Sequence, residues 1–341
     1  MKQDRHAPRR HGTVTVVAVA GLLLGCVLSV ILGARPTSPN AAFSALFAGP
    51  TGHDPTGLSQ VVWQLRLPRT ALAMLTGAAL AVSGALAQAW TRNPLADPGI
   101  IGITAGSGFA IAVGVTVGVV GTGPQAMLAL LGAGLVAVAI LLVARLSEDP
   151  LTLLLVGFGI AASLTAGTTL LALYDTSVLD GMRQWTVGST VGRDADDLVI
   201  AACGLVLGLV PAVAAARPMD LLSMGEGAAV GLGGSPATTR TLTALAVVIL
   251  AGGATAAVGP IAFVGFAAPH IIRRFTGPTL TRMLVPVLLT GAAITLVADV
   301  VGRVIARPGE VEVSVVLAVI GAPLLIASVA RPRSRAGMEL V

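Results

Sequence analysis

The chain has 341 residues, of which 55% are hydrophobic and only 11% are charged, and its formal net charge is +5. Soluble domains carry roughly a quarter charged residues, so this composition excludes an ordinary water-soluble protein. The basic residues lie at the ends of apolar segments without interleaved aromatic residues, which excludes a nucleic-acid-binding surface. Cys26 and Cys203 both lie in apolar runs and cannot form a metal cluster.

Long uncharged apolar segments follow one another along the chain. Residues 98–144, 150–174 and 241–269 contain no Asp, Glu, Lys or Arg, and a transmembrane helix needs about 20 such residues. We predict an all-α polytopic membrane protein with ten spans, at about 13–34, 69–89, 99–120, 125–144, 151–173, 198–216, 239–258, 261–272, 284–302 and 313–330. The eighth span is short and is expected to be a broken helix packed inside the protein. A single membrane domain then covers 13–330, between basic termini at 1–12 and 331–341.

Charge counting predicts the orientation of these spans. Ten crossings put both termini on one side, and that side would carry fourteen of the Lys and Arg residues against seven on the other. The positive-inside rule therefore predicts that both termini are cytoplasmic. Leu23-Leu24-Gly25-Cys26 resembles a bacterial lipoprotein cleavage site, but the apolar segment continues to about Ala34 and many spans follow, which favours a first span.

Arg66-Leu67-Pro68-Arg69 precedes the second span on the predicted external side. Proline is well tolerated in a first helical turn, whereas two external arginines run against the positive-inside rule. Two interpretations remain open from the residues alone. The arginines either anchor the helix at the membrane interface or form a docking point for an acidic partner.

A second polar segment, Thr91 to Gly99, connects spans two and three. Its two prolines, each close to an Asn or Asp, predict a defined cytoplasmic turn. The glycines that follow do not form a phosphate-binding P-loop, because that motif requires a lysine and the only lysine in the chain is Lys2. If ATP drives this protein, the ATPase is another polypeptide.

The third polar segment, at about 217–238, is amphipathic and broken at glycines. Such a segment lies either on the membrane surface or in a groove of a partner protein. The residues alone do not choose between these alternatives.

Neither a catalytic constellation nor a metal-ligand spacing emerges from the sequence. His270 lies at a helix break beside Arg273 and Arg274, where a structural role is the simpler interpretation. Asp299 is an intramembrane carboxylate and as such a candidate functional group, but an ion pair with Arg303 at i,i+4 explains it more simply. A proton-coupled carrier would be expected to hold more acids in its spans.

Together these motifs resemble the permease family of iron-siderophore and vitamin B12 ABC importers, over nearly the whole chain. The motifs, in family order, are Arg66-Leu67-Pro68-Arg69, Gly77 to Gly84 with Gln88, Arg92 to Pro98, Met224-Gly225-Glu226 with Leu232-Gly233, Gly259 to Gly265 with Pro269-His270, Ala298-Asp299 with Arg303, and Gly321-Ala322-Pro323. Each motif alone is weak, whereas the ordered series is specific.

The resemblance implies a type II ABC importer permease with ten transmembrane helices, in a bacterial cytoplasmic membrane. Its expected partners are a second permease (a paralogue or an identical copy), two cytoplasmic ATPases that bind ATP and Mg, an extracytoplasmic binding protein and a ferric-siderophore cargo. The chain itself is expected to be no enzyme and to bind no cofactor, metal or nucleic acid.

The resemblance also assigns roles to residues. Docking of the binding protein is assigned to Arg66, Arg69 and Arg303. Coupling to the ATPases is assigned to Leu221, Leu222, Met224, Gly225, Glu226, Leu232 and Gly233, within about 217–238. The pathway or its gate is expected at Ser83, Gln88, Asn93, Pro94, Thr104 and Ser107.

One departure from the family pattern concerns the external mouth. Where the family has Glu-Leu-Pro-Val-Gly before the last helix, this chain has Glu310-Val311-Glu312-Val313-Ser314, so the docking surface or outer gate differs there. The Thr91 to Pro98 segment is closer to siderophore permeases than to vitamin B12 permeases. A vitamin B12 or haem importer permease remains the alternative within the family, and an ion-coupled secondary transporter is the alternative from another class.

Overall fold

The computed structural model describes residues 7–50, 57–99, 102–119, 121–146 and 150–330, and the regular structure of these residues is helical. The elements in chain order are α1 (Ala7–Ile31), α2 (Pro39–Ala48), α3 (Leu58–Gln60), the π-helical turn η1 (Val61–Arg66), α4 (Leu67–Trp90), α5 (Ile103–Thr116), α6 (Thr122–Leu146), α7 (Pro150–Tyr174), α8 (Thr176–Val187), α9 (Ala195–Leu222), α10 (Glu226–Gly231), α11 (Pro236–Val258), α12 (Val264–Thr276), α13 (Leu280–Ile305) and α14 (Val313–Ala330).

The predicted fold class is confirmed. Seven described helices are long and apolar enough to cross a membrane, and α5 and α14 are shorter apolar helices. The short eighth span is α12, which has 13 residues and begins after Phe263, a residue in the left-handed region at φ +69°. Its first six residues are buried, as expected for a short helix inside the protein.

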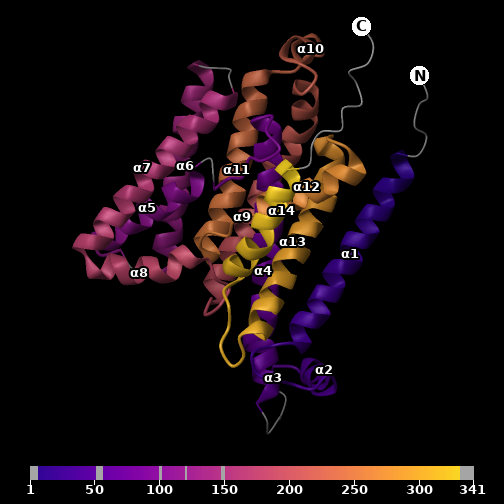
Figure 1. Ribbon diagram of the computed structural model, residues 1–341, viewed down its shortest axis with the longest axis vertical. Helices are drawn as coiled ribbons and strands as arrows, with labels where there is room; N and C mark the ends of the chain where they lie inside the picture. The colour runs from indigo at the N-terminus through magenta and orange to yellow at the C-terminus, as the bar shows by residue number, and fades with distance from the viewer. Residues whose placement is uncertain (1–6, 51–56, 100–101, 120, 147–149, 331–341) are drawn as a thin grey trace.

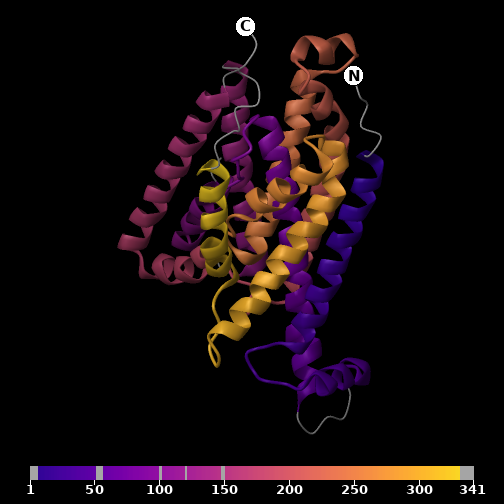
Figure 2. The ribbon, with the colours of Figure 1, turned by 45° about the vertical axis from the view of Figure 1, so that its right-hand side comes forward.

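Helices α4 and α11 form the centre of the bundle, and the other long helices surround them (Figure 1). We compare the share of buried residues in the apolar 18-residue stretch of each helix. This share is 83% for the helix that contains α4 and 78% for α11, but 22% for α1 and 6% for α7. Helix α1 lies along α13 on one side, and α6 and α7 lie on the other (Figures 1 and 2). The nearly uncovered α7 is therefore a peripheral helix of this single chain.

Close backbone approach holds the central helices together. A Cβ atom on Gly84 of α4 would lie 2.0 Å from the carbonyl oxygen of Gly265 in α12. Likewise, a Cβ atom on Gly291 of α13 would lie 2.4 Å from the carbonyl oxygen of Gly77 in α4. Glycines at such crossings let helices pack through dispersion contacts, which is the main attraction available between helices in lipid.

The two ends of the bundle carry different short elements (Figure 2). Helix α10 marks one end, where α1 begins and α14 ends; we call this the α10 end. Helices α2 and α3 mark the opposite end, which we call the α2 end. Two segments between the predicted spans contain helices: α2 has Ser38 as its N-cap, and α8 has Asp175 as its N-cap.

The amphipathic segment at 217–238 is shorter than predicted. Helix α9 continues through Pro218 to Leu222 instead of ending near residue 216. Met219 and Leu222 are buried against the bundle, so tertiary packing extends the helix where the sequence pattern becomes amphipathic. Only α10 and the turns on either side of it remain outside the long helices.

Candidate functional site

A cluster of charged residues lies at the α2 end and joins three parts of the chain. Arg69 in α4 donates from Nε and Nη2 to Asp299 Oδ1 in α13, at 3.0 and 2.8 Å, and from Nη1 to Glu310 Oε2 at 2.5 Å. Arg303 pairs with the other Asp299 oxygen, and Thr190 donates to Asp299 Oδ1 at 2.6 Å. The expected Asp299–Arg303 pair is therefore present, within a larger network in which Asp299 is fully buried.

Arg66, predicted to dock a partner, lies inside the protein. Its side chain is 4% exposed, and Nη1 donates to the carbonyl oxygens of Val30 and Ile31 at 2.6 and 3.0 Å. These carbonyls belong to the last turn of α1, which has no intrahelical donors for them. Arg66 thus caps α1. Arg303 is equally enclosed, at 2% exposure, so Arg69 is the member of the predicted docking set that reaches the surface.

The predicted pathway residues of α4 and α5 also have internal partners. Ser83 donates to the carbonyl oxygen of Val247 in α11 at 3.2 Å, and Ser107 donates to that of Ala129 in α6 at 2.9 Å. Gln88 donates to the carbonyl oxygen of Gly265 at 3.1 Å and accepts from Arg273 Nη2 at 2.9 Å. All three predicted side chains are at most 2% exposed within this one chain. Adding a second subunit cannot expose them, so in this conformation they join helices instead of lining an opening.

The remaining predicted gate residues are Asn93 and Pro94 in the turn between α4 and α5, and Thr104 at the start of α5. Asn93 Oδ1 accepts from the N–H of Leu95 at 2.9 Å, Thr104 is half-buried and Pro94 is exposed. In the same turn, burial raises the pKa of Asp97 to about 6, although the N–H of Gly99 donates to its Oδ1 at 2.9 Å and opposes the shift.

The predicted coupling residues divide into exposed and buried sets. Met224 and Leu232, on either side of α10, are 70% and 64% exposed. Leu222 is buried and Leu221 is half-buried, as both still belong to α9. Gly225 and Gly233 have φ values of +112° and +82° and make the turns on either side of α10, where glycine is the residue best suited.

Two coupling contacts were not foreseen from the sequence. Glu226 of α10 pairs with Arg240 of α11. Asp220 of α9 accepts from the N–H groups of Leu280 and Thr281 at 2.6 and 3.0 Å, and from the Thr281 hydroxyl at 2.5 Å. Asp220 therefore caps the first turn of α13. It is 60 residues away in sequence, so no local signal identifies it as that cap.

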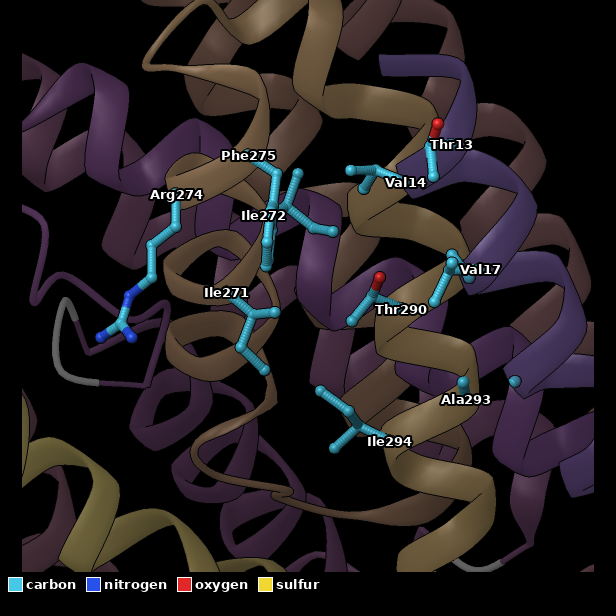
Figure 3. A pocket seen from close by; sticks show the side chains of 12 residues that line it. Thr13, Val14, Val17, Ile271, Ile272, Arg274, Phe275, Thr290, Ala293 and Ile294 are labelled. Carbon is cyan, nitrogen blue, oxygen red and sulfur yellow. The ribbon is translucent and has the colours of Figure 1, made fainter. Parts of the chain in front are cut away.

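An apolar groove of about 1000 Å³ lies between α1, α12 and α13. Figure 3 shows Val14 and Val17 of α1 facing Ile271 and Ile294 across it. None of the predicted site residues lines it. Among the residues described, no group of three or more His, Cys, Asp or Glu side chains is placed to hold a metal ion.

Comparison with known proteins agrees with this architecture. The chain is 38% identical to the ferric enterobactin transport system permease protein FepD of Escherichia coli (strain K12), covering 96% of this chain and 99% of that protein. It is 36% identical to the Fe(3+)-citrate import system permease protein YfmE of Bacillus subtilis (strain 168), covering 96% and 97%.

A solved structure of a metal-chelate type ABC transporter in an inward-facing conformation matches with a TM-score of 0.81 and 28% identity, covering 93% of this chain and 99% of that one. The FecCD transport family profile matches residues 21–331. The ordered motifs, the helical bundle and these similarities along almost the entire chain lead to one assignment: the protein is a multi-pass membrane protein that belongs to the FecCD transport family.

Proposed function

We propose that this chain is the translocating permease subunit of an ATP-driven importer that carries a ferric siderophore or a related iron chelate. The observation that carries the proposal is full-length similarity to permeases named for ferric enterobactin and Fe(3+)-citrate. The lack of a P-loop lysine assigns ATP hydrolysis to separate ATPase subunits. The iron arrives already chelated, so the permease needs no iron ligands of its own.

The α10 end is the proposed ATPase-binding face. Met224 and Leu232 form an exposed apolar pair beside a short helix held by the Glu226–Arg240 ion pair. Exposed apolar side chains on either side of a defined helix suit insertion into a groove on a partner. This choice favours partner binding over membrane-surface binding for the amphipathic segment, and it puts the α10 end and both termini in the cytoplasm, in line with the positive-inside rule.

A second permease subunit is proposed to cover α7. The relatives FepD and FepG of Escherichia coli are both named as permeases of a ferric enterobactin transport system, which favours a paralogous partner. Helix α7 is the least covered long helix of this chain. It exposes Gly159, Ser163 and Ala166 along one face, and small residues at such spacing suit close contact with another helix.

The α2 end is the proposed docking face for the binding protein, with Arg69 as the contact that an acidic side chain can reach. Arg66 and Arg303 support this face from within, by holding α1 and Asp299. Such charged contacts mainly set docking orientation and association rate.

Helix α13 connects the two faces. Asp220 holds its first turn at the α10 end, and Asp299 belongs to the charged cluster at the α2 end. Movement of α10 and the end of α9 upon ATP binding would therefore pull on α13 and alter the outer cluster. This linkage is the proposed route of alternating access.

Reconstitution tests the proposal. The chain, co-expressed with its neighbouring permease and ATPase genes, should bind the ATPase and import iron-loaded catecholate or citrate chelates into proteoliposomes only with ATP and binding protein. Cobalamin and haem serve as competing cargoes that test the alternatives within the family. Uptake that persists with a hydrolysis-deficient ATPase, or ATPase binding that survives deletion of residues 225–233, would contradict the importer assignment.

A further inference from the structure

A pocket of about 360 Å³, lined by charged as well as apolar side chains, lies beside the charged cluster at the α2 end. It lies between the start of α4, the loop from α8 to α9 and the loop from α13 to α14. Of the described residues that line it, five are arginines and two are carboxylates. One of the carboxylates is Glu310. An excess of guanidinium groups in a partly enclosed pocket favours an anion, and arginine suits a carboxylate in particular.

The arginines of this pocket are not equally available. Arg66 is committed to the carbonyl oxygens at the end of α1. Arg303 is committed to Asp299, and its buried Nε atom has no hydrogen-bond partner among the described residues. Arg69 is 13% exposed, and its Nη1 atom bonds Glu310 instead of buried Asp299. The guanidinium of Arg69 therefore binds buried Asp299 on one side and partly exposed Glu310 on the other.

The two carboxylates on Arg69 differ in the same way. Asp299 is fully buried and accepts hydrogen bonds or ion pairs from Arg69, Arg303 and Thr190. Glu310 is 25% exposed and, among the described residues, has a single ion pair, to Arg69. It belongs to a seven-residue connection, 306–312, between α13 and α14. Displacing Glu310 breaks one ion pair, whereas displacing Asp299 would break its contacts with Arg69, Arg303 and Thr190 together, so Glu310 is the carboxylate that a partner can replace.

We infer that Glu310 is an internal substitute for the partner's carboxylate, which an acidic side chain of the docking binding protein displaces from Arg69. This inference rests on the proposed function and adds to it a competition at the docking site. At Arg69, the free energy of docking then contains only the difference between the ion pair that forms with the binding protein and the Glu310–Arg69 pair that breaks. Its second effect is to release the connection in front of α14, whose first turn is bonded to the carbonyl oxygen of Glu312. Release of Glu310 is thus a direct signal from the docking face to a transmembrane helix.

The test measures the affinity of the purified binding protein for the complete importer in nanodiscs, with the chain as wild type, E310Q, R69Q and the double variant. E310Q should dock about fivefold more tightly, the factor expected from removing a partly exposed competing pair. Its affinity should also fall more steeply with salt, because docking then forms an ion pair without breaking one. R69Q should dock more weakly, and adding E310Q to R69Q should give no gain.

Glu312 provides the matched control, since it is a neighbouring carboxylate in the same connection and has no ion pair to Arg69. E312Q should leave affinity and salt dependence as in wild type. Glu310→Asp is the second variant: it keeps the charge but is one methylene shorter, which weakens its contact with Arg69, so it should act in the same direction as E310Q with a smaller effect.

Unchanged or weaker docking by both E310Q and Glu310→Asp, at wild-type melting temperature, would overturn the inference. A matching gain in the R69Q background would overturn it as well, because the gain would not pass through Arg69. If the two Glu310 variants melt early and dock weakly, Glu310 is a structural residue and the inference is equally wrong. Failure of the proposed function looks different, because the wild-type complex itself would then neither dock a binding protein nor import iron chelates.

Discussion

Replacing Asp220 with alanine should partly uncouple ATP hydrolysis from transport. Asp220 lies in the last turn of α9, before α10, and caps α13 through two backbone N–H groups and the Thr281 hydroxyl. Loss of an N-cap costs about 0.5–2 kcal/mol, and loss of the negative charge at the helix N-terminus adds about 0.3–1 kcal/mol. The combined cost is about 2 kcal/mol, enough to change a conformational equilibrium by more than tenfold.

The assay is the number of chelates imported per ATP hydrolysed in proteoliposomes, together with the melting temperature of the complex. D220A should hydrolyse ATP with less stimulation by the binding protein and should import several-fold fewer chelates per ATP. D220N retains one carbonyl acceptor and should be intermediate.

Ser38→Ala is the control. Ser38 caps α2 at the opposite end of the bundle, at 3.3 Å from the N–H of Ala41, and its loss should leave the transport ratio unchanged. If D220A lowers the melting temperature but transports as many chelates per ATP as wild type, the cap only stabilises α13. The route from α10 through Asp220 would then be refuted.

Three further predictions concern packing, capping and pH. Gly84→Ala should destabilise the complex by about 1–3 kcal/mol, because its methyl group would meet the Gly265 carbonyl oxygen. Gly134→Ala is the control and should not destabilise the complex, because Gly134 has open space around it. Equal melting temperatures of the two variants would contradict the packing argument. Arg66→Ala should lower the free energy of unfolding by about 1.5–3 kcal/mol, because two α1 carbonyls lose their charged donor. The affinity of the folded fraction for the binding protein should stay near that of wild type. A large selective loss of affinity would show that Arg66 belongs to the docking surface. Asp97, with a folded-state pKa raised from 3.8 to about 6, contributes stability that is fully present below pH 3.8 and is lost as pH rises through 6. The melting temperature of wild type should therefore rise relative to that of D97N as pH falls from 7 to 4. An equal pH dependence of the two melting temperatures would show that burial does not raise the pKa of this carboxylate.

Much of the fold is visible in the sequence because the membrane imposes a local rule. Every backbone polar group in the hydrocarbon must be bonded within the chain, so an uncharged run of about 20 apolar residues becomes a helix whatever its neighbours are. The seven described helices that are long and apolar enough to cross a membrane follow from such runs. The family was equally readable, because its motifs occur in polar segments of constant order.

The hydrogen-bond and ion-pair partners of polar side chains could not be predicted from the sequence in this way. Arg69 and Glu310 are 241 residues apart, Gln88 and Arg273 are 185 apart, and Asp220 and Leu280 are 60 apart. Each pair depends on which helices cross and at what depth, and a motif does not report this. The buried positions of Arg66, Ser83 and Gln88 have the same cause: a polar residue inside a bundle must find a partner on another helix, and only the packing of those helices determines whether it faces an opening or closes one.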